Sequence, residues 1–150
     1  MKKLSLIILL FCLLGCDTDE EVSVYTGNEQ QYALSQASNF PVNGFVVFRE
    51  RRDNLTEIKI SLTGTEGDIN HPAHLHYGNI SNPDADMALL LTPVNGNTGE
   101  SISLANALND ETPMTYDDFI NFDGHIKIHQ DDGPNKNVIL ALGNIGSAAN

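Results

Sequence analysis

The feature that most constrains the fold is a series of short β-forming segments separated by turn residues about every eight to twelve positions. Residues 55–62 illustrate the pattern, because Ile58, Ile60 and Leu62 alternate with polar side chains. Further strands are predicted over residues 45–48, 73–77, 87–91, 126–128 and 138–142. Strong turn sequences separate them, such as Asn-Gly-Asn-Thr-Gly at 95–99. The pattern predicts an all-β fold, an antiparallel sandwich or barrel.

One segment departs from this pattern and predicts a short helix. Residues 115–122 begin with Thr115, a residue type that caps helix N-termini. Asp117 and Asp118 follow, and their negative charge suits the first helical turn. Residues 102–108 fit neither pattern clearly.

The first fifteen residues are typical of an export signal that is removed. Lys2 and Lys3 precede an apolar run over 4–14, which is shorter than the ~20 residues that span a bilayer. Leu-Leu-Gly-Cys at 13–16 resembles a bacterial lipobox. The resemblance implies that Cys16 is lipidated and becomes the new N-terminus. The alternative is an ordinary signal peptide that contains a cysteine.

The rest of the chain divides into an acidic tether, residues 16–28, and a single β-sandwich domain, residues 29–150. The sequence Asp-Thr-Asp-Glu-Glu follows Cys16. Such a run resembles surface-export signals of some Gram-negative bacteria, and a plain spacer is the alternative. We therefore expect a lipid-anchored protein of the bacterial cell envelope, on the periplasmic or the surface-exposed side of the outer membrane.

Composition excludes several classes of function. The chain has 8 basic and 20 acidic residues, a net charge of −12, and removing residues 1–15 takes away two lysines and leaves −14. Nucleic-acid binding is not expected, because it needs a basic surface. Contact with the lipid bilayer would come from the acyl chains on Cys16. With Cys12 removed and Cys16 capped, disulfides and thiol chemistry are also excluded.

All five histidines fall in two short clusters, His-Pro-Ala-His-Leu-His at 71–76 and Gly-His-Ile-Lys-Ile-His at 124–129. Imidazole is the usual ligand of copper and zinc at a site without thiols. The clusters can meet if their strands are neighbours. The alternative is that they are surface histidines of edge strands.

Strand geometry separates the candidate ligands. His74 and His76 share a face, ~6.6 Å apart along the backbone, and can reach one ion. His125 and His129 also share a face but lie ~13 Å apart, too far for one ion with bonds of ~2 Å. A regular strand therefore lets only one of this pair bind, whereas a helical segment would allow both.

Four segments, in order, resemble the copper–zinc superoxide dismutase family. Gly-Phe-Val-Val-Phe at 44–48 is similar to its first strand, and His-Leu-His-Tyr-Gly at 74–78 resembles its copper-binding His-x-His motif. The sequence at 126–133 resembles the strand that ends in another copper-binding histidine. Ala-Leu-Gly-Asn-Ile-Gly at 141–146 resembles the closing strand. The resemblance implies a Greek-key β-sandwich or barrel of the dismutase type.

The resemblance also implies a site for one copper or zinc ion, formed by His74, His76 and His129. His71, held in an extended conformation by Pro72, is the expected fourth ligand. His125, Asp131 and Asp132 are expected beside the ligands, where the two carboxylates could orient an imidazole.

The departures from the family bear on catalysis. No histidine lies between Gly78 and Gly124 to match the family's bridging ligand, and its zinc loop and disulfide are missing. Ile139 stands where the family has an active-site arginine. An acidic surface without that arginine repels superoxide, so we rank binding above catalysis and assign no catalytic residue.

Three functions remain open. The first is binding of copper or zinc for storage, delivery or scavenging, and the second is zinc-free, copper-dependent superoxide dismutation. The third follows from a second resemblance, to chordin-type (CHRD) domains, which share a His-x-His-Gly-like segment, an apolar strand and a Gly-rich turn. It implies an interaction module without metal. The sequence identifies no protein partner, and no phosphate loop, Gly-x-Ser-x-Gly or zincin helix suggests another enzyme class.

Overall fold

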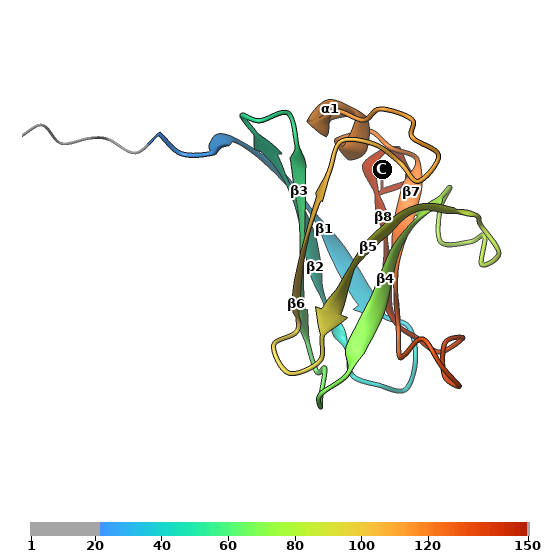
Figure 1. The fold of residues 1–150 in the computed structure, drawn as a ribbon. Coiled ribbons are helices and arrows are strands. Elements are labelled where there is room, and N and C mark those ends of the chain that lie inside the picture. Colours follow the sequence, from blue (N-terminus) through green and yellow to red (C-terminus); the bar gives the residue numbers. More distant parts are fainter. Residues whose placement is uncertain (1–21, 150) are drawn as a thin grey trace, which may run out of the picture.

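The computed structural model describes residues 22–149 (Figure 1). The predicted signal peptide, the lipidation site Cys16 and the acidic run after it lie outside the described residues. Within residues 22–149, no helix has the length and hydrophobicity needed to cross a membrane.

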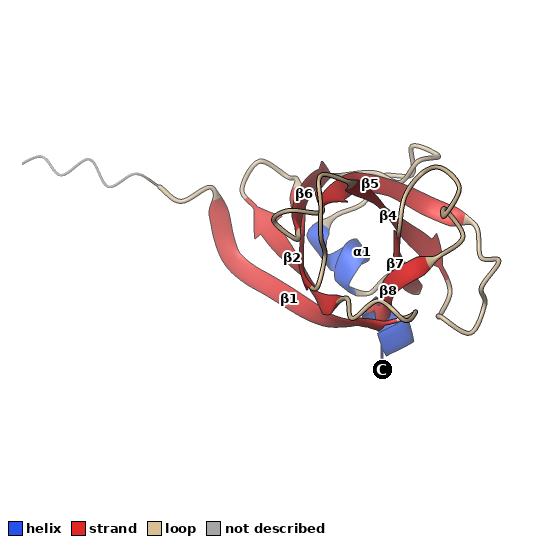
Figure 2. Ribbon diagram, turned by 90° about the horizontal axis from the view of Figure 1, so that it is seen from below, coloured by secondary structure: helices blue, strands red, loops and turns tan. Residues whose placement is uncertain are grey.

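The fold is all-β, as predicted, with eight antiparallel strands in a nearly closed barrel (Figures 1 and 2). The strands are β1 (Tyr25–Gln36), β2 (Asn43–Arg51), β3 (Thr56–Thr63), β4 (Asn70–Tyr77), β5 (Met87–Asn95), β6 (Glu100–Ala105), β7 (Gly124–His129) and β8 (Ile139–Ile145). The ambiguous segment 102–108 thus contributes mainly to β6.

The strand order around the sheet is β5-β4-β7-β8-β1-β2-β3-β6. Because β4 pairs with β7 and β3 pairs with β6, the chain crosses between distant strands in the manner of a Greek key. The two edge strands, β5 and β6, approach each other, and the Thr92 backbone N–H donates to Ser103 Oγ at 2.8 Å across this seam. Side chains therefore help to close the barrel where backbone pairing stops.

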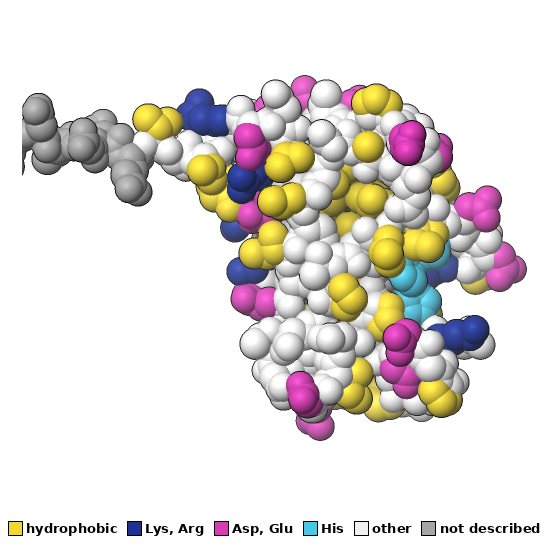
Figure 3. All heavy atoms as spheres, viewed as in Figure 1, with side chains coloured by type: hydrophobic (Ala, Val, Ile, Leu, Met, Phe, Trp, Pro, Cys, Tyr) yellow, Lys and Arg dark blue, Asp and Glu magenta, His cyan; other side chains and the backbone are white. Residues whose placement is uncertain are grey.

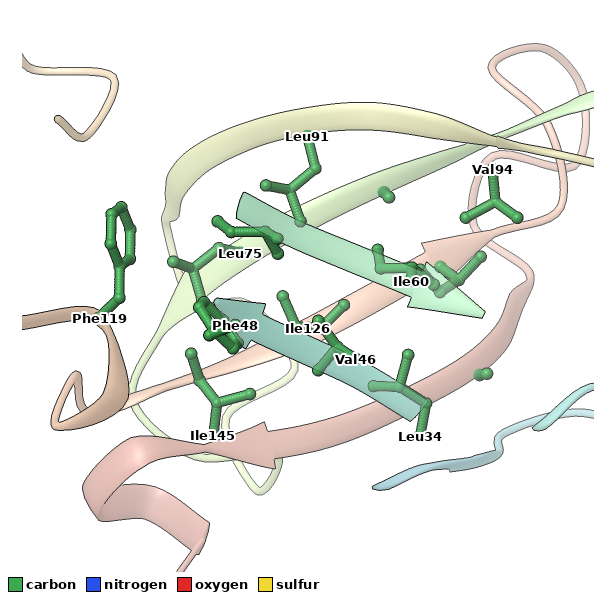
Figure 4. Close-up of a cluster of buried hydrophobic side chains, with 14 of the residues drawn as sticks. Leu34, Val46, Phe48, Ile60, Leu75, Leu91, Val94, Phe119, Ile126 and Ile145 are labelled. Atoms are coloured by element: carbon green, nitrogen blue, oxygen red, sulfur yellow. The ribbon is translucent and has the colours of Figure 1, made fainter. Parts of the chain in front are cut away.

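The core fills the barrel with alternate side chains of the strands (Figure 4). Ile58, Ile60 and Leu62 of β3 are buried, which confirms the alternation predicted for this segment. Ile126 and Ile128 of β7 are likewise fully buried. The histidines and the lysine at the positions between and beside these isoleucines therefore point away from the barrel interior.

The predicted helix is present as α1 (Tyr116–Ile120), which lies across one end of the barrel (Figure 1). Thr115 is its N-cap, and its side chain and Asp118 form a reciprocal capping box. Phe119 is fully buried, and its ring centroid lies 6.1 Å from that of Phe48 in β2. A short helix at this position thus closes the core, and a 3-10 helix (Gly146–Ala149) ends the described chain.

The domain begins earlier than the predicted boundary at residue 29. Strand β1 starts at Tyr25 and pairs with β2, with a register shift between Tyr25 and Glu29. The Tyr25 hydroxyl donates to the Glu57 carboxylate at 2.6 Å, and Arg49 contacts the same carboxylate at 3.2 Å. Polar contacts, rather than the burial of alternate apolar side chains, hold the start of this exposed strand. For this reason its sequence lacks the apolar alternation by which a strand is predicted.

Candidate metal centre

The two histidine clusters lie on neighbouring strands, because β4 and β7 pair in antiparallel register. His76 is the Cα partner of His125, and His74 is the partner of Lys127. The intervening residues point into the core, so the polar side chains share the outer face of the barrel. The space-filling view in Figure 3 shows imidazoles gathered at the surface near β4.

The structure brings three of the predicted ligands together. His74, His76 and His129 each offer one ring nitrogen, and these nitrogens lie within 4.8 Å of one another. The ring centroids of His74 and His129 are 4.9 Å apart, and those of His74 and His76 are 5.8 Å apart. Two nitrogens bound to one ion at ~2.1 Å can be about 4.2 Å apart at most. A small inward movement of the rings is therefore enough for the group to bind a metal ion.

Hydrogen bonds fix the tautomer of two of these ligands. His76 Nδ1 lies 2.8 Å from the Ala85 carbonyl oxygen, and His129 Nδ1 lies 2.6 Å from that of Lys136. A carbonyl only accepts, so each Nδ1 carries the hydrogen and each neutral ring has its lone pair on Nε2. Both Nε2 atoms are buried and have no hydrogen-bond partner among the described residues, and the same holds for the Nε2 atoms of His71 and His125. A metal ion would satisfy these buried acceptors.

The surroundings favour the neutral form of His74 and His76. Burial, with smaller contributions from His129, His76 and Lys127, lowers the pKa of His74 to about 4. Burial also lowers the pKa of His76, although its hydrogen bond to Ala85 opposes the change. Only neutral imidazole binds metal, so these shifts keep both ligands available below the usual pKa of histidine.

His125 lies outside the group of three, as the strand spacing predicts. Its ring stacks on that of His76, with centroids 5.2 Å apart and an angle of 16° between the planes. Its Nδ1 lies 2.7 Å from the Gly78 carbonyl oxygen. Gly78 has a φ of +65°, which glycine adopts without strain. Burial lowers the pKa of His125, and this hydrogen bond opposes the change.

His71 is not part of the group, contrary to the expectation of a fourth ligand. Strand alternation turns it to the face opposite His74, where it lines a separate cavity of about 280 Å³ with Val42 and Leu140. Its Nδ1 lies 2.8 Å from the Gln130 carbonyl oxygen. His71 and His74 are three residues apart, and in a strand an odd spacing separates two side chains by the thickness of the sheet.

Asp131 and Asp132 lie beside the candidate ligands, but Asp131 forms its hydrogen bonds within its own turn. Asp131 and Asp132 line an open cavity of about 340 Å³ together with His74 and His129. Asp131 accepts hydrogen bonds from Gly133 and Asn135 in its own turn. Backbone carbonyls instead orient the imidazoles of His76 and His129. The sequence gives no signal for such partners, because every residue has a backbone carbonyl.

Sequence reasoning also missed Lys127 and the loop over residues 78–86. Lys127 is 9% exposed, and its ammonium donates to the Pro83 carbonyl oxygen at 2.6 Å. Ala85 and Gly78 in the same loop accept from His76 and His125. The loop therefore covers part of the histidine face. The alternation within Gly-His-Ile-Lys-Ile-His could have predicted the position of Lys127, because it puts the lysine on the same face of the strand as the histidines.

Comparisons with protein family models, with curated proteins and with solved structures find no match for this chain. The metal centre is therefore inferred from the residues and the geometry of this chain alone.

Proposed function

We propose that this protein is an exported lipoprotein, anchored through Cys16, that binds one copper or zinc ion for storage or delivery. His74, His76 and His129 are the ligands. One observation carries the proposal: the three imidazoles converge from two paired strands, with ligand nitrogens within 4.8 Å. The Nε2 atoms of His76 and His129 are also buried without a hydrogen-bond partner among the described residues, which is costly for an acceptor. Those of His71 and His125 are unpartnered too, but only His76 and His129 have a ligand atom within 4.8 Å of one on His74 in the group of three.

A dismutase-like scaffold is part of the proposal. The four segments that resemble that family fall on strands β2, β4, β7 and β8 of one antiparallel barrel. The His-x-His segment and the segment that ends at His129 lie on paired strands, as a shared metal site requires. The open cavity beside His74 and His129 leaves room for an ion to enter and leave, which suits storage or delivery.

The test is titration of Cu(II) and Zn(II) into the full chain, with calorimetry for affinity and elemental analysis for stoichiometry. We expect one ion per chain. His74→Ala, His76→Ala and His129→Ala should each weaken binding by at least tenfold, because each removes one of three ligand atoms. His125→Ala is the control within the second histidine cluster. It removes a buried imidazole from the same outer face of the barrel and should change the affinity by less than threefold.

His71→Ala is a further control, because this side chain lies on the opposite face of β4. Equal losses in all five variants would point to unfolding, which thermal denaturation without metal would detect. A wild-type chain that binds neither metal would overturn the proposal and leave the chordin-like interaction module as the better interpretation.

A further inference from the structure

Lys127 places a positive charge beside the candidate metal site. It is the Cα partner of His74 in the β4–β7 pair, and side chains that face each other in this way have Cβ atoms about 4.5–5.5 Å apart. Its neighbours Ile126 and Ile128 point into the core, so Lys127 shares the outer face with His129 and His125. Its ammonium is held by the Pro83 carbonyl, which keeps it on this face.

The three histidine ligands contribute no charge to offset that ammonium. The nearby carboxylates belong to the loops: Asp84 interacts with Lys127, and Asp131 and Asp132 line the open cavity. Coulomb repulsion is proportional to the product of the charges, so Lys127 repels a divalent ion twice as strongly as a monovalent one. The repulsion is weakly screened because Lys127 is nearly buried.

We propose that Lys127 is a specificity-determining residue, whose charge weakens the binding of Cu(II) and Zn(II) relative to that of monovalent copper, Cu(I). The inference rests on the proposed metal-binding function and names the ion class that this charge favours. Three neutral imidazole ligands suit copper as well as zinc, so the ligands by themselves do not select one of these ions. The ammonium adds an electrostatic preference that the ligands alone do not provide.

The experiment measures the affinities of the full chain for Cu(I) and Cu(II) by competition with chromophoric chelators. Lys127→Met removes the charge and keeps an apolar side chain of similar length. The matched variant Lys127→Arg keeps the charge. Lys59→Met removes an equal charge from β3, where Lys59 pairs with Glu100 at 2.9 Å, on a strand that pairs with neither β4 nor β7.

We expect the ratio of Cu(II) to Cu(I) affinity to rise about tenfold in Lys127→Met, which corresponds to a midpoint potential lower by about 59 mV for a one-electron couple. The Lys127→Arg and Lys59→Met ratios should stay within twofold of wild type. If Lys127→Met does not fold, Lys127→Gln, which keeps a donor for Pro83, provides the same comparison.

Three results would overturn the inference, and they are distinguishable. If wild type binds copper but neither Lys127→Met nor Lys127→Gln changes the ratio of affinities, Lys127 only holds the loop over residues 78–86 through its hydrogen bond to Pro83. The proposed function then stands. If wild type binds zinc but no copper, the preference fails and the proposed function stands. If it binds neither zinc nor copper in either oxidation state, both fail.

Discussion

At the scale of single residues, the histidines differ by what each Nδ1 contacts and which way each ring faces. His76 and His129 donate to carbonyls and keep Nε2 free beside His74. His125 also donates to a carbonyl, yet it stacks beside the group rather than joining it. The register of a histidine on its strand therefore decides whether its side chain is placed to bind a metal ion or packs beside the candidate ligands.

The titration of His74 tests this arrangement in the metal-free protein. Its pKa is about 4 in the folded state and about 6.5 in an unfolded chain. Between these values the unfolded state binds more protons, so the free energy of unfolding should fall as the pH falls from 6.5 toward 4. His74→Asn should weaken this dependence, as measured by thermal unfolding at pH 7 and pH 4.5.

Nuclear magnetic resonance of the His74 ring gives the second measurement. We expect its midpoint near pH 4, well below that of a solvent-exposed imidazole. A midpoint at about 6.5 would mean that the ring is hydrated and that the group of three is more open than the structure has it.

At the scale of elements, the barrel depends on close contact between β1 and β8. These strands share only two register pairs, Ser35 with Leu142 and Gln36 with Ala141. Gly143 follows directly, and a Cβ there would clash with the Ala33 carbonyl oxygen and approach Leu34 Cδ2 to 3.2 Å. The glycine of the Ala-Leu-Gly-Asn-Ile-Gly segment is thus explained by the approach of one backbone to another.

Gly143→Ala should therefore destabilise the fold by about 1–3 kcal/mol, since the added methyl group forces the strands apart. Chemical denaturation monitored by circular dichroism measures the loss. Gly133→Ala is the matched control, because its Cβ would meet only Asp131 Oδ1 at 3.7 Å, an ordinary contact. Similar stability for Gly143→Ala and wild type would show that β1 and β8 can separate without cost.

At the scale of the whole molecule, charge and attachment decide where the protein can work. The chain carries a net charge of −12, which disfavours association with polyanions such as nucleic acid or anionic lipid. An acidic molecule attracts cations, which suits metal binding. Attachment to a membrane then depends on the lipid proposed for Cys16.

Cys16→Ser in the full chain should abolish lipidation and move the protein from the membrane fraction to the soluble fraction, because serine cannot form the thioether that carries the lipid. Fractionation of cells followed by detergent partitioning measures the shift. Cys12→Ser is the matched control and should leave the distribution unchanged. Membrane association that persists in Cys16→Ser would contradict the lipobox interpretation.

The sequence by itself determined the fold class, the helix and the composition of the site. Alternation over residues 55–62 predicts a half-buried strand, and Thr115 with Asp118 predicts the start of a helix. The two histidine clusters indicate imidazole ligands. These signals are local, because each depends on residues a few positions apart. The start of β1 escaped prediction because polar partners from β2 and β3 hold it.

Only the tertiary structure decided which histidines meet. The pairing of β4 with β7 joins residues 47 to 55 positions apart, and sequence spacing contains no information about such a register. The pairing brings His129 to His74 and His76, as the family resemblance implied, and it places Lys127 opposite His74. The structure also leaves His71 outside the group and gives His129 a carbonyl partner in place of the predicted aspartates. The physical reason is that ligand residues follow from local composition, whereas their convergence depends on strand register, side-chain direction and the loops that cover the strands.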